Sequence, residues 1–205
     1  MFEDKNDKIN LEYKIITLGD CSVGKTSIIK RYITDTFDED TAPTLGITHS
    51  FKILEVGHDS KIKLSIIDTN GQEKYKSLSV SYFRHADVVL FIFNLNEPKS
   101  FINIQEWINT YNKNNEKRAL LRYLIGNKSD LEQKVEQNLI DEFAEKNEMP
   151  YIATSAKNNS QINELFQQIG EELLKEEKKK SNTSIEKKGS FRILYTTKKK
   201  KKCCK

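Results

Sequence analysis

The sequence has little cysteine and histidine, and it has no long apolar run. Its three cysteines are too few for a disulfide framework or a four-ligand zinc site, and its three histidines show no metal-ligand spacing. No window approaches about 18 consecutive apolar residues, so we expect no membrane-spanning helix. Residues 1–10 lack the apolar core of a signal peptide. We therefore expect a protein of a reducing compartment, in the cytosol or on its membrane surfaces.

Charge is divided unevenly along the chain, although the net charge of +4 is small. Residues 176–205 carry 12 basic and 3 acidic residues, while residues 1–175 carry 22 basic and 27 acidic residues. A nucleic-acid-binding domain needs a basic face on its folded part, whereas here the positive charge lies in a low-complexity segment, so we expect no nucleic-acid partner. We predict a flexible stretch at residues 1–10, one folded domain at residues 11–175 and a disordered basic tail at residues 176–205.

Apolar runs rich in β-branched residues alternate with segments of helical periodicity. Six runs predict strands, at residues 13–18, 47–56, 62–67, 88–93, 120–125 and 151–153. Helical periods predict helices at residues 25–33, 78–84, 101–112, 135–147 and 161–174. Alternation of this kind favours a mostly parallel sheet that is covered by helices on both faces.

The second and third predicted strands are joined only by Gly57-His58-Asp59-Ser60. This connection is too short to hold a crossover helix, so the two strands are predicted to pair antiparallel at an edge of the sheet. The predicted fold class is therefore α/β, with a six-stranded mixed sheet that is mostly parallel, one antiparallel edge hairpin, and helices on both faces.

The segment from Gly19 to Thr26 fits the pattern GxxxxGK[ST] and stands where the first predicted strand gives way to the first predicted helix. This order indicates the phosphate-binding loop of a P-loop NTPase rather than a plain glycine-rich turn. Glycines let successive backbone N–H groups face one anion, Lys25 neutralises β- and γ-phosphate charge, and the Thr26 hydroxyl ligates Mg²⁺. The predicted contacts are Gly19, Asp20, Cys21, Ser22, Val23, Gly24, Lys25, Thr26 and Ser27.

Two polar segments after the fifth and sixth predicted strands indicate which base is bound. Asn127-Lys128-Ser129-Asp130 matches NKxD, and the Asp130 carboxylate can accept both the N1–H and the N2 amine of guanine. Adenine lacks this donor pair and would leave a desolvated carboxylate unpaired. Lys128 is predicted to lie along the base plane, and backbone N–H groups of Ser155-Ala156-Lys157 to reach guanine O6. A plain polar loop is the alternative interpretation of each segment.

The third predicted strand ends in Asp68-Thr69-Asn70-Gly71-Gln72-Glu73. An acid at this place is typical of a Walker-B aspartate, so Asp68 is predicted to hold Mg²⁺ through water. The Gly71 N–H is predicted to contact the γ-phosphate. Gln72 carries both a donor and an acceptor and is predicted to orient the attacking water. The alternative is an ordinary polar turn.

In this order, these motifs resemble the Ras superfamily of small GTPases over residues 13–174. The resemblance implies that Thr44 is the switch I threonine, which binds Mg²⁺ and senses the γ-phosphate, and that Phe37 packs edge-on against guanine. It also implies a monomeric GTP/GDP switch with slow intrinsic hydrolysis and effectors that bind the switch regions. The further partners it implies are a GTPase-activating protein, an exchange factor, a prenylation escort and a GDP-dissociation inhibitor.

Three segments and the paired cysteines near the end are most similar to the Rab branch, which implies a role in intracellular vesicle transport. The segments are Lys63–Asp68, Tyr75–Leu78 and Ser81–Asp87. Asn70 departs from the family pattern, which has alanine beside the Mg²⁺ and γ-phosphate site. A slowly hydrolysing or GTP-locked scaffold is therefore the alternative function. A P-loop metabolic kinase is disfavoured, because no lid or second-substrate site is visible.

Two residues near the loop have alternative roles. Cys21 stands where many Rab proteins have serine, and a backbone donor role is favoured over a redox role. Arg31 is the only arginine between Lys25 and Thr44. Its place on the first predicted helix predicts a solvated surface residue rather than a catalytic arginine finger.

The end of the chain is predicted to anchor it to a membrane. Lys198–Lys202 suit an anionic leaflet, and the adjacent Cys203 and Cys204 suit dual geranylgeranylation. A CaaX box is excluded because no cysteine stands fourth from the end. The resemblance therefore implies the cytoplasmic face of an endomembrane, with cycling through the cytosol. An unlipidated, solvated tail is the alternative.

Overall fold

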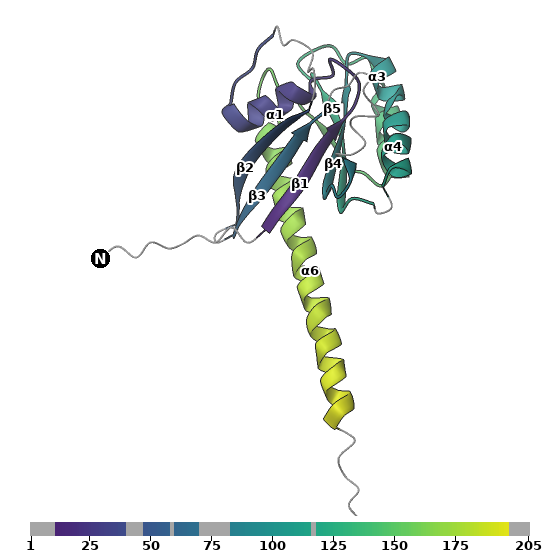
Figure 1. Ribbon diagram of the computed structural model, residues 1–205. Helices are drawn as coiled ribbons and strands as arrows, with labels where there is room; N and C mark the ends of the chain where they lie inside the picture. The colour runs from purple at the N-terminus through teal and green to yellow at the C-terminus, as the bar shows by residue number, and fades with distance from the viewer. Residues whose placement is uncertain (1–10, 40–46, 58–59, 70–82, 116–117, 197–205) are drawn as a thin grey trace, which may run out of the picture.

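The computed structural model describes residues 11–39, 47–57, 60–69, 83–115 and 118–196, and only the backbone of residues 181–196. A six-stranded sheet forms its centre (Figure 1). The strands are β1 (Leu11–Leu18), β2 (Thr48–Val56), β3 (Ser60–Asp68), β4 (Val88–Asn94), β5 (Leu121–Asn127) and β6 (Tyr151–Ala153), in the order β2-β3-β1-β4-β5-β6. Among the described strands only β2 and β3 pair antiparallel, so the predicted mixed sheet is confirmed.

Helices cover both faces of the sheet, as predicted. They are α1 (Lys25–Thr34), α3 (Pro98–Ile102), α4 (Ile104–Lys113), α5 (Gln137–Lys146) and α6 (Ile162–Thr196). One buried cluster joins Ile15 and its neighbours to α1 and α6, and a second joins Ile16 and its neighbours to α3, α4 and α5. Adjacent residues of a strand point to opposite faces, which explains why Ile15 and Ile16 belong to different clusters. The apolar runs of β1 and β4 are continuous because both faces of these strands are buried.

The single helix predicted at residues 101–112 is wrong. Two helices occupy this region, α3 and α4, and Asn103 lies between them. Pro98 stands at the first position of α3, where its missing N–H costs no helical hydrogen bond and its fixed φ suits a helix start. The Asn103 N–H bonds to the Lys99 carbonyl, and the Asn103 carbonyl accepts from the Trp107 N–H. The chain therefore turns within a continuous hydrogen-bonded segment that periodicity alone does not divide.

The helix α6 differs from the prediction of a disordered segment from residue 176 onward. It continues to Thr196 and leaves the domain as a single extended helix (Figure 1). Residues 176–180 are glutamates and lysines with high helix propensity, and Lys179 pairs with Glu176 at 2.5 Å across one turn. Its apolar packing on the domain ends earlier, with Leu173 and Leu174. A domain boundary near residue 175 remains a prediction.

No helix in the described part of the chain is both long enough and apolar enough to span a bilayer. Several predictions fall outside the described residues. They concern the flexible stretch at residues 1–10, most of the helix at residues 78–84, and the end of the chain at residues 197–205.

The parallel arrangement brings the ends of four strands to one edge of the sheet. Gly19 follows β1, Asp68 ends β3, Asn127 ends β5, and Ser155 lies just beyond β6. The register aligns Asn94 at the end of β4 with Asn127. β3 lies on one side of β1, and β4, the next strand along the chain, lies on the other side. The strand order therefore reverses direction at β1, and ligands of open α/β sheets bind at such a topological switch point.

Candidate functional site

The loop between β1 and α1 lies so close to its neighbours that two of its positions can hold only glycine. At Gly19 a Cβ atom would stand 2.0 Å from the Ile92 carbonyl oxygen of β4. At Gly24, where φ is +97°, it would stand 2.2 Å from the Asn127 side-chain nitrogen. Both glycines are therefore required by close approach and also by their positive φ, which is +150° at Gly19.

Lys25, the first residue of α1, places a buried charge beside this loop. Its side chain is 5% exposed, and its Nζ donates to the Gly19 carbonyl at 2.9 Å and to the Asp20 carbonyl at 2.6 Å. Burial lowers the pKa of Lys25 to about 8, although the nearby Asp68 carboxylate raises it. The ammonium is thus held inside the curve of the loop, where an anion would replace the solvent that it has lost.

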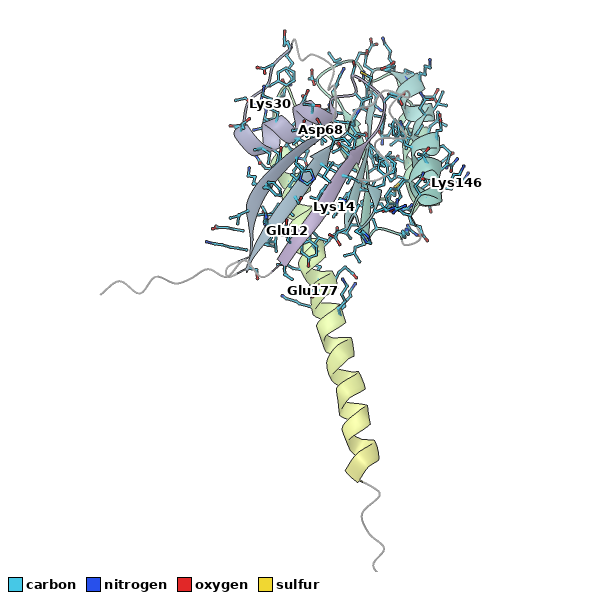
Figure 2. The ribbon with its side chains drawn as sticks, in the orientation of Figure 1. Glu12, Lys14, Lys30, Asp68, Lys146 and Glu177 are labelled. Carbon is cyan, nitrogen blue, oxygen red and sulfur yellow. The ribbon has the colours of Figure 1, made fainter. Side chains whose placement is uncertain are left out.

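Thr26 and Asp68 bring two oxygen ligands together beside Lys25. The Thr26 hydroxyl donates to Asp68 Oδ2 at 2.5 Å, and the Thr17 hydroxyl lies 3.4 Å from Asp68 Oδ1. Asp68 is 2% exposed, and its burial raises its pKa, while the Thr26 hydrogen bond and the Lys25 charge lower it. Figure 2 shows Asp68 at the end of the sheet beside α1, far from Glu12 and Glu177. Hydroxyl and carboxylate oxygens fit the preference of Mg²⁺.

Asp20 places a second carboxylate in the loop, and two donors from the α3–α4 region hold it. Asn103 Nδ2 donates to Asp20 Oδ2 at 2.7 Å, and the indole Nε1 of Trp107 donates to Oδ1 at 2.8 Å. Trp107 is 2% exposed and belongs to the core. Both oxygens of Asp20 are therefore bound to the protein, which fixes the backbone of the loop against α4.

Asn127 joins the loop to the far side of the site. Its Nδ2 donates to the Val23 carbonyl at 2.9 Å, and its Oδ1 lies 3.3 Å from both the Thr154 hydroxyl and the Ala156 N–H. The side chain is 1% exposed. One buried amide thus links the loop after β1 to the segment after β6.

Asp130 is oriented by a residue of the neighbouring segment. The Ser155 hydroxyl donates to Asp130 Oδ1 at 2.5 Å and accepts from the Asn158 N–H at 3.0 Å. A carboxylate has about four lone-pair sites, so this single bond leaves Asp130 able to accept two further donors. This capacity matches the N1–H and N2 amine of a guanine.

Arg31 corrects one prediction, because its side chain is only 15% exposed and is not a solvated surface group. Its Nε donates to the Ala156 carbonyl at 2.9 Å, and its two terminal nitrogens donate to the carbonyls of Asp35 and Lys157. Its guanidinium carbon lies 6.0 Å from the ring centre of Phe37. The guanidinium is thus engaged in holding the segment after β6.

The predicted site residues that are described gather at one edge of the sheet. Residues 19–24 form the loop and residues 25–27 the first turn of α1, Asp68 lies beside them, and residues 127–130 and 155–157 lie across from them. Phe37 packs next to Arg31 at the same end. Thr44, Gly71, Gln72, Cys203 and Cys204 lie outside the described residues.

Sequence reasoning missed four residues that support this arrangement. They are Thr17, Asn103, Trp107 and Glu39, whose carboxylate accepts from the Lys157 Nζ at 2.6 Å. A partial signal existed for two of them. Asn103 and the only tryptophan of the chain are four positions apart in a helical segment, which places them on one face.

Comparison with known proteins gives consistent results. The model of the Ras family matches residues 14–175. The chain is 38% identical to the Ras-related protein Rab-17 of Mus musculus over 163 aligned residues. The alignment covers 78% of this chain and 75% of that protein. The chain is 33% identical over 164 residues to Rab-13 of Bos taurus, with coverage of 79% and 80%. It is 34% identical over 155 residues to the Ras-related protein SEC4 of Saccharomyces cerevisiae, with coverage of 75% and 71%.

Proposed function

The chain belongs to the Ras family of small GTPases, as a divergent member of its Rab branch, and on this premise we propose that it regulates vesicle traffic as a GTP/GDP switch. As a member of this family it binds guanine nucleotide and hydrolyses GTP. The observation that best supports the proposal for this chain is the Asn127 side chain. It bonds to the phosphate-binding loop through Val23 and, through Ala156, to residues 155–159, which we call the base-binding segment, so the two halves form one site.

Lys25 and the backbone of its loop bind the phosphates in this proposal. The ammonium is already desolvated and held by two carbonyls, so it faces an anion at little cost of reorganisation. Asp130, oriented by Ser155, reads the N1–H and the N2 amine of guanine. Lys128 and Phe37 flank the base.

Thr26 and Asp68 would hold Mg²⁺ together with Thr44. The fit rests on the hydroxyl oxygen of the half-buried Thr26 and the carboxylate oxygen of the buried Asp68, which meet at 2.5 Å next to the Lys25 ammonium. The metal supplies charge neutralisation to the phosphates. Thr44 also senses the γ-phosphate, and this couples bound nucleotide to the conformation of switch I.

Gln72 orients the attacking water and Gly71 contacts the γ-phosphate. Intrinsic hydrolysis is expected to be slow, on the order of 10⁻⁴ s⁻¹, and a partner's arginine would raise it by roughly 10³ to 10⁵. Arg31 cannot take this role in the described arrangement, because its guanidinium nitrogens bond to backbone carbonyls of other segments. We therefore propose that a GTPase-activating protein completes the site, and that an exchange factor reloads it.

Two cysteines and a lysine run attach the monomeric protein to the cytoplasmic face of an endomembrane. Prenylated Cys203 and Cys204 insert into the bilayer, and Lys198–Lys202 add about 1 kcal/mol each near an anionic surface. A prenylation escort and a GDP-dissociation inhibitor handle the lipidated form. A tagged chain that lacks both cysteines should become diffuse in cells. Membrane localisation that persists without them would contradict the anchor.

Nucleotide competition tests the base assignment. Labelled GDP should be displaced by unlabelled GTP and not by ATP, since adenine leaves Asp130 without its two donors. Equal competition by ATP would contradict a guanine site.

Single-turnover hydrolysis tests the switch. Gln72→Leu should slow the hydrolysis of bound GTP without weakening GTP binding, because leucine can neither donate to water nor accept from it. An unchanged rate in the variant would show that another group orients the water. Absence of hydrolysis by the wild-type chain, even with cell extract, would indicate a GTP-locked scaffold.

A further inference from the structure

The base-binding segment, residues 155–159, is held from outside by α1. We propose that Arg31 is a positioning residue that, with Asp35 and Glu39, forms a bridge from α1 to residues 155–159 and sets the rate of nucleotide release. The proposal rests on the proposed function, because it concerns the base-binding half of that nucleotide site. We call this set of contacts the α1 bridge.

The guanidinium of Arg31 binds two successive carbonyls of the base-binding segment. Its Nε donates to the Ala156 oxygen at 2.9 Å, and one terminal nitrogen donates to the Lys157 oxygen at 3.2 Å. The C=O and N–H of a trans peptide point in opposite directions. Holding the Ala156 carbonyl toward α1 therefore turns the Lys157 N–H to the opposite side of the segment.

The same guanidinium also closes the end of α1. Its other terminal nitrogen donates to the Asp35 carbonyl at 2.8 Å and lies 3.2 Å from Asp35 Oδ1, while the Asp35 N–H donates back to the Arg31 carbonyl. Asp35 Oδ1 additionally accepts from Asn159 Nδ2 at 3.1 Å. The planar fork of an arginine satisfies these partners in fixed directions, which a lysine ammonium does not.

An exposed contact continues the bridge toward switch I. The Lys157 Nζ donates to Glu39 Oε1 at 2.6 Å, and these side chains are 52% and 69% exposed. Glu39 stands five positions before Thr44 in the sequence. Residues 35–39 are thus bound to the base-binding segment at both of their ends, and a partner that displaces them would pull on that segment.

The chemistry of these contacts predicts a kinetic role. Hydrogen bonds to a charged group are stronger than those between neutral groups, so loosening the base-binding segment requires breaking several strong contacts. Removing the guanidinium should lower this barrier. Because GTP and GDP carry the same base, both nucleotides should be affected alike.

Release of a fluorescent GDP analogue into excess GDP tests the proposal with the full chain. Arg31→Gln should accelerate release by roughly tenfold or more, and Asp35→Asn by a smaller factor, with the Arg31→Lys rate falling between that of Arg31→Gln and wild type. Arg118→Gln is the matched control. Arg118 pairs with the exposed Glu148, and these two residues precede β5 and β6 respectively, at the end of these strands opposite to the nucleotide site. This variant should release GDP at the wild-type rate. The affinity ratio of GTP to GDP should stay unchanged in every variant.

The outcomes separate the bridge from the site itself. Wild-type release rates in both Arg31→Gln and Asp35→Asn would overturn the α1 bridge. A changed GTP-to-GDP ratio would also overturn it, because the damage would then lie in the phosphate half. If Arg31→Gln does not fold, Asp35→Asn decides alone, since asparagine tolerates the left-handed conformation of residue 35, where φ is 54°. Failure of the wild-type chain to bind GDP would contradict the proposed function instead.

Discussion

The nucleotide site has a phosphate half, formed by residues 19–27 and Asp68, and a base half, formed by residues 127–130 and 155–159. The two halves are held by contacts of different kinds. In the phosphate half, Lys25, Asp68 and Trp107 are at most 5% exposed. In the base half, the ion pair between Lys157 and Glu39 is more than half exposed at each end. Buried charged contacts are strong and little affected by salt, whereas exposed ion pairs are worth about 0–1 kcal/mol.

This difference indicates which half of the site loosens first when nucleotide is released. The phosphate loop is fixed by the core through Trp107 and by the close approach of Gly19 to β4. The base-binding segment is held from inside by the buried Asn127, and from outside by Arg31 of α1 and by the exposed Glu39 that follows α1. We therefore expect nucleotide release to begin at the base half while the phosphate half stays formed.

The largest effect is expected from removing the buried ammonium of the phosphate half. Lys25→Met keeps the apolar stem but loses the charge, so GDP affinity should fall by about a thousandfold as strong contacts to the phosphates are lost. Equilibrium titration with a fluorescent GDP measures it. Lys146→Met, an exposed change at the end of α5 (Figure 2), is the control and should bind as wild type. A loss below tenfold in Lys25→Met would mean that the phosphate half does not dominate affinity.

A smaller loss is expected from the base half. Asp130→Asn removes the charge that accepts the N1–H and N2 amine, so GDP affinity should fall about 100-fold. The fall should be less for inosine diphosphate, which lacks the N2 amine. Asp141→Asn, on the exposed side of α5, should change neither affinity. An equal loss for both nucleotides would show that Asp130 does not read the amine.

The anchor of the phosphate loop should matter more for stability than for release. Trp107→Phe leaves Asp20 Oδ1 without its indole donor, at a cost of about 1–3 kcal/mol in the free energy of unfolding with GDP in excess. Thermal unfolding with GDP in excess measures it, and GDP release should change less than in Arg31→Gln. Tyr32→Phe is the aromatic control, because the Tyr32 hydroxyl is buried and has no hydrogen-bond partner among the described residues. A destabilisation of equal size in the control would mean that the change in stability does not report the indole hydrogen bond.

Much of the fold and part of the site follow from local pattern. The apolar runs gave all six strands, and the short link at Gly57 gave the antiparallel hairpin, because these signals depend on neighbouring residues. The pattern GxxxxGK[ST] requires glycine for reasons that the close approaches of Gly19 and Gly24 make concrete. Such features are encoded within a few positions of the chain.

The rest depends on residues that are distant in the sequence. Trp107 meets Asp20 across 87 positions, and Arg31 meets Ala156 across 125, so no local pattern reveals either contact. An arginine on an amphipathic helix looks solvated until the segment that it binds is in place. The division at Asn103 was missed for a different reason, since the helical period continues through it.

The smallest expected effect distinguishes the two halves by salt. Raising salt from about 0.1 M to about 1 M shortens the screening length from about 10 Å to about 3 Å, which weakens exposed pairs and spares buried ones. Because the pair between Glu39 and Lys157 is exposed, wild-type GDP release should quicken about twofold more than that of Glu39→Gln, which has already lost the pair. Glu12→Gln breaks the exposed pair with Lys63 at the far end of the sheet and should keep the wild-type salt response. Identical salt responses in wild type and Glu39→Gln would mean that the base half is held without its surface contact, and that the contrast in exposure has no kinetic consequence.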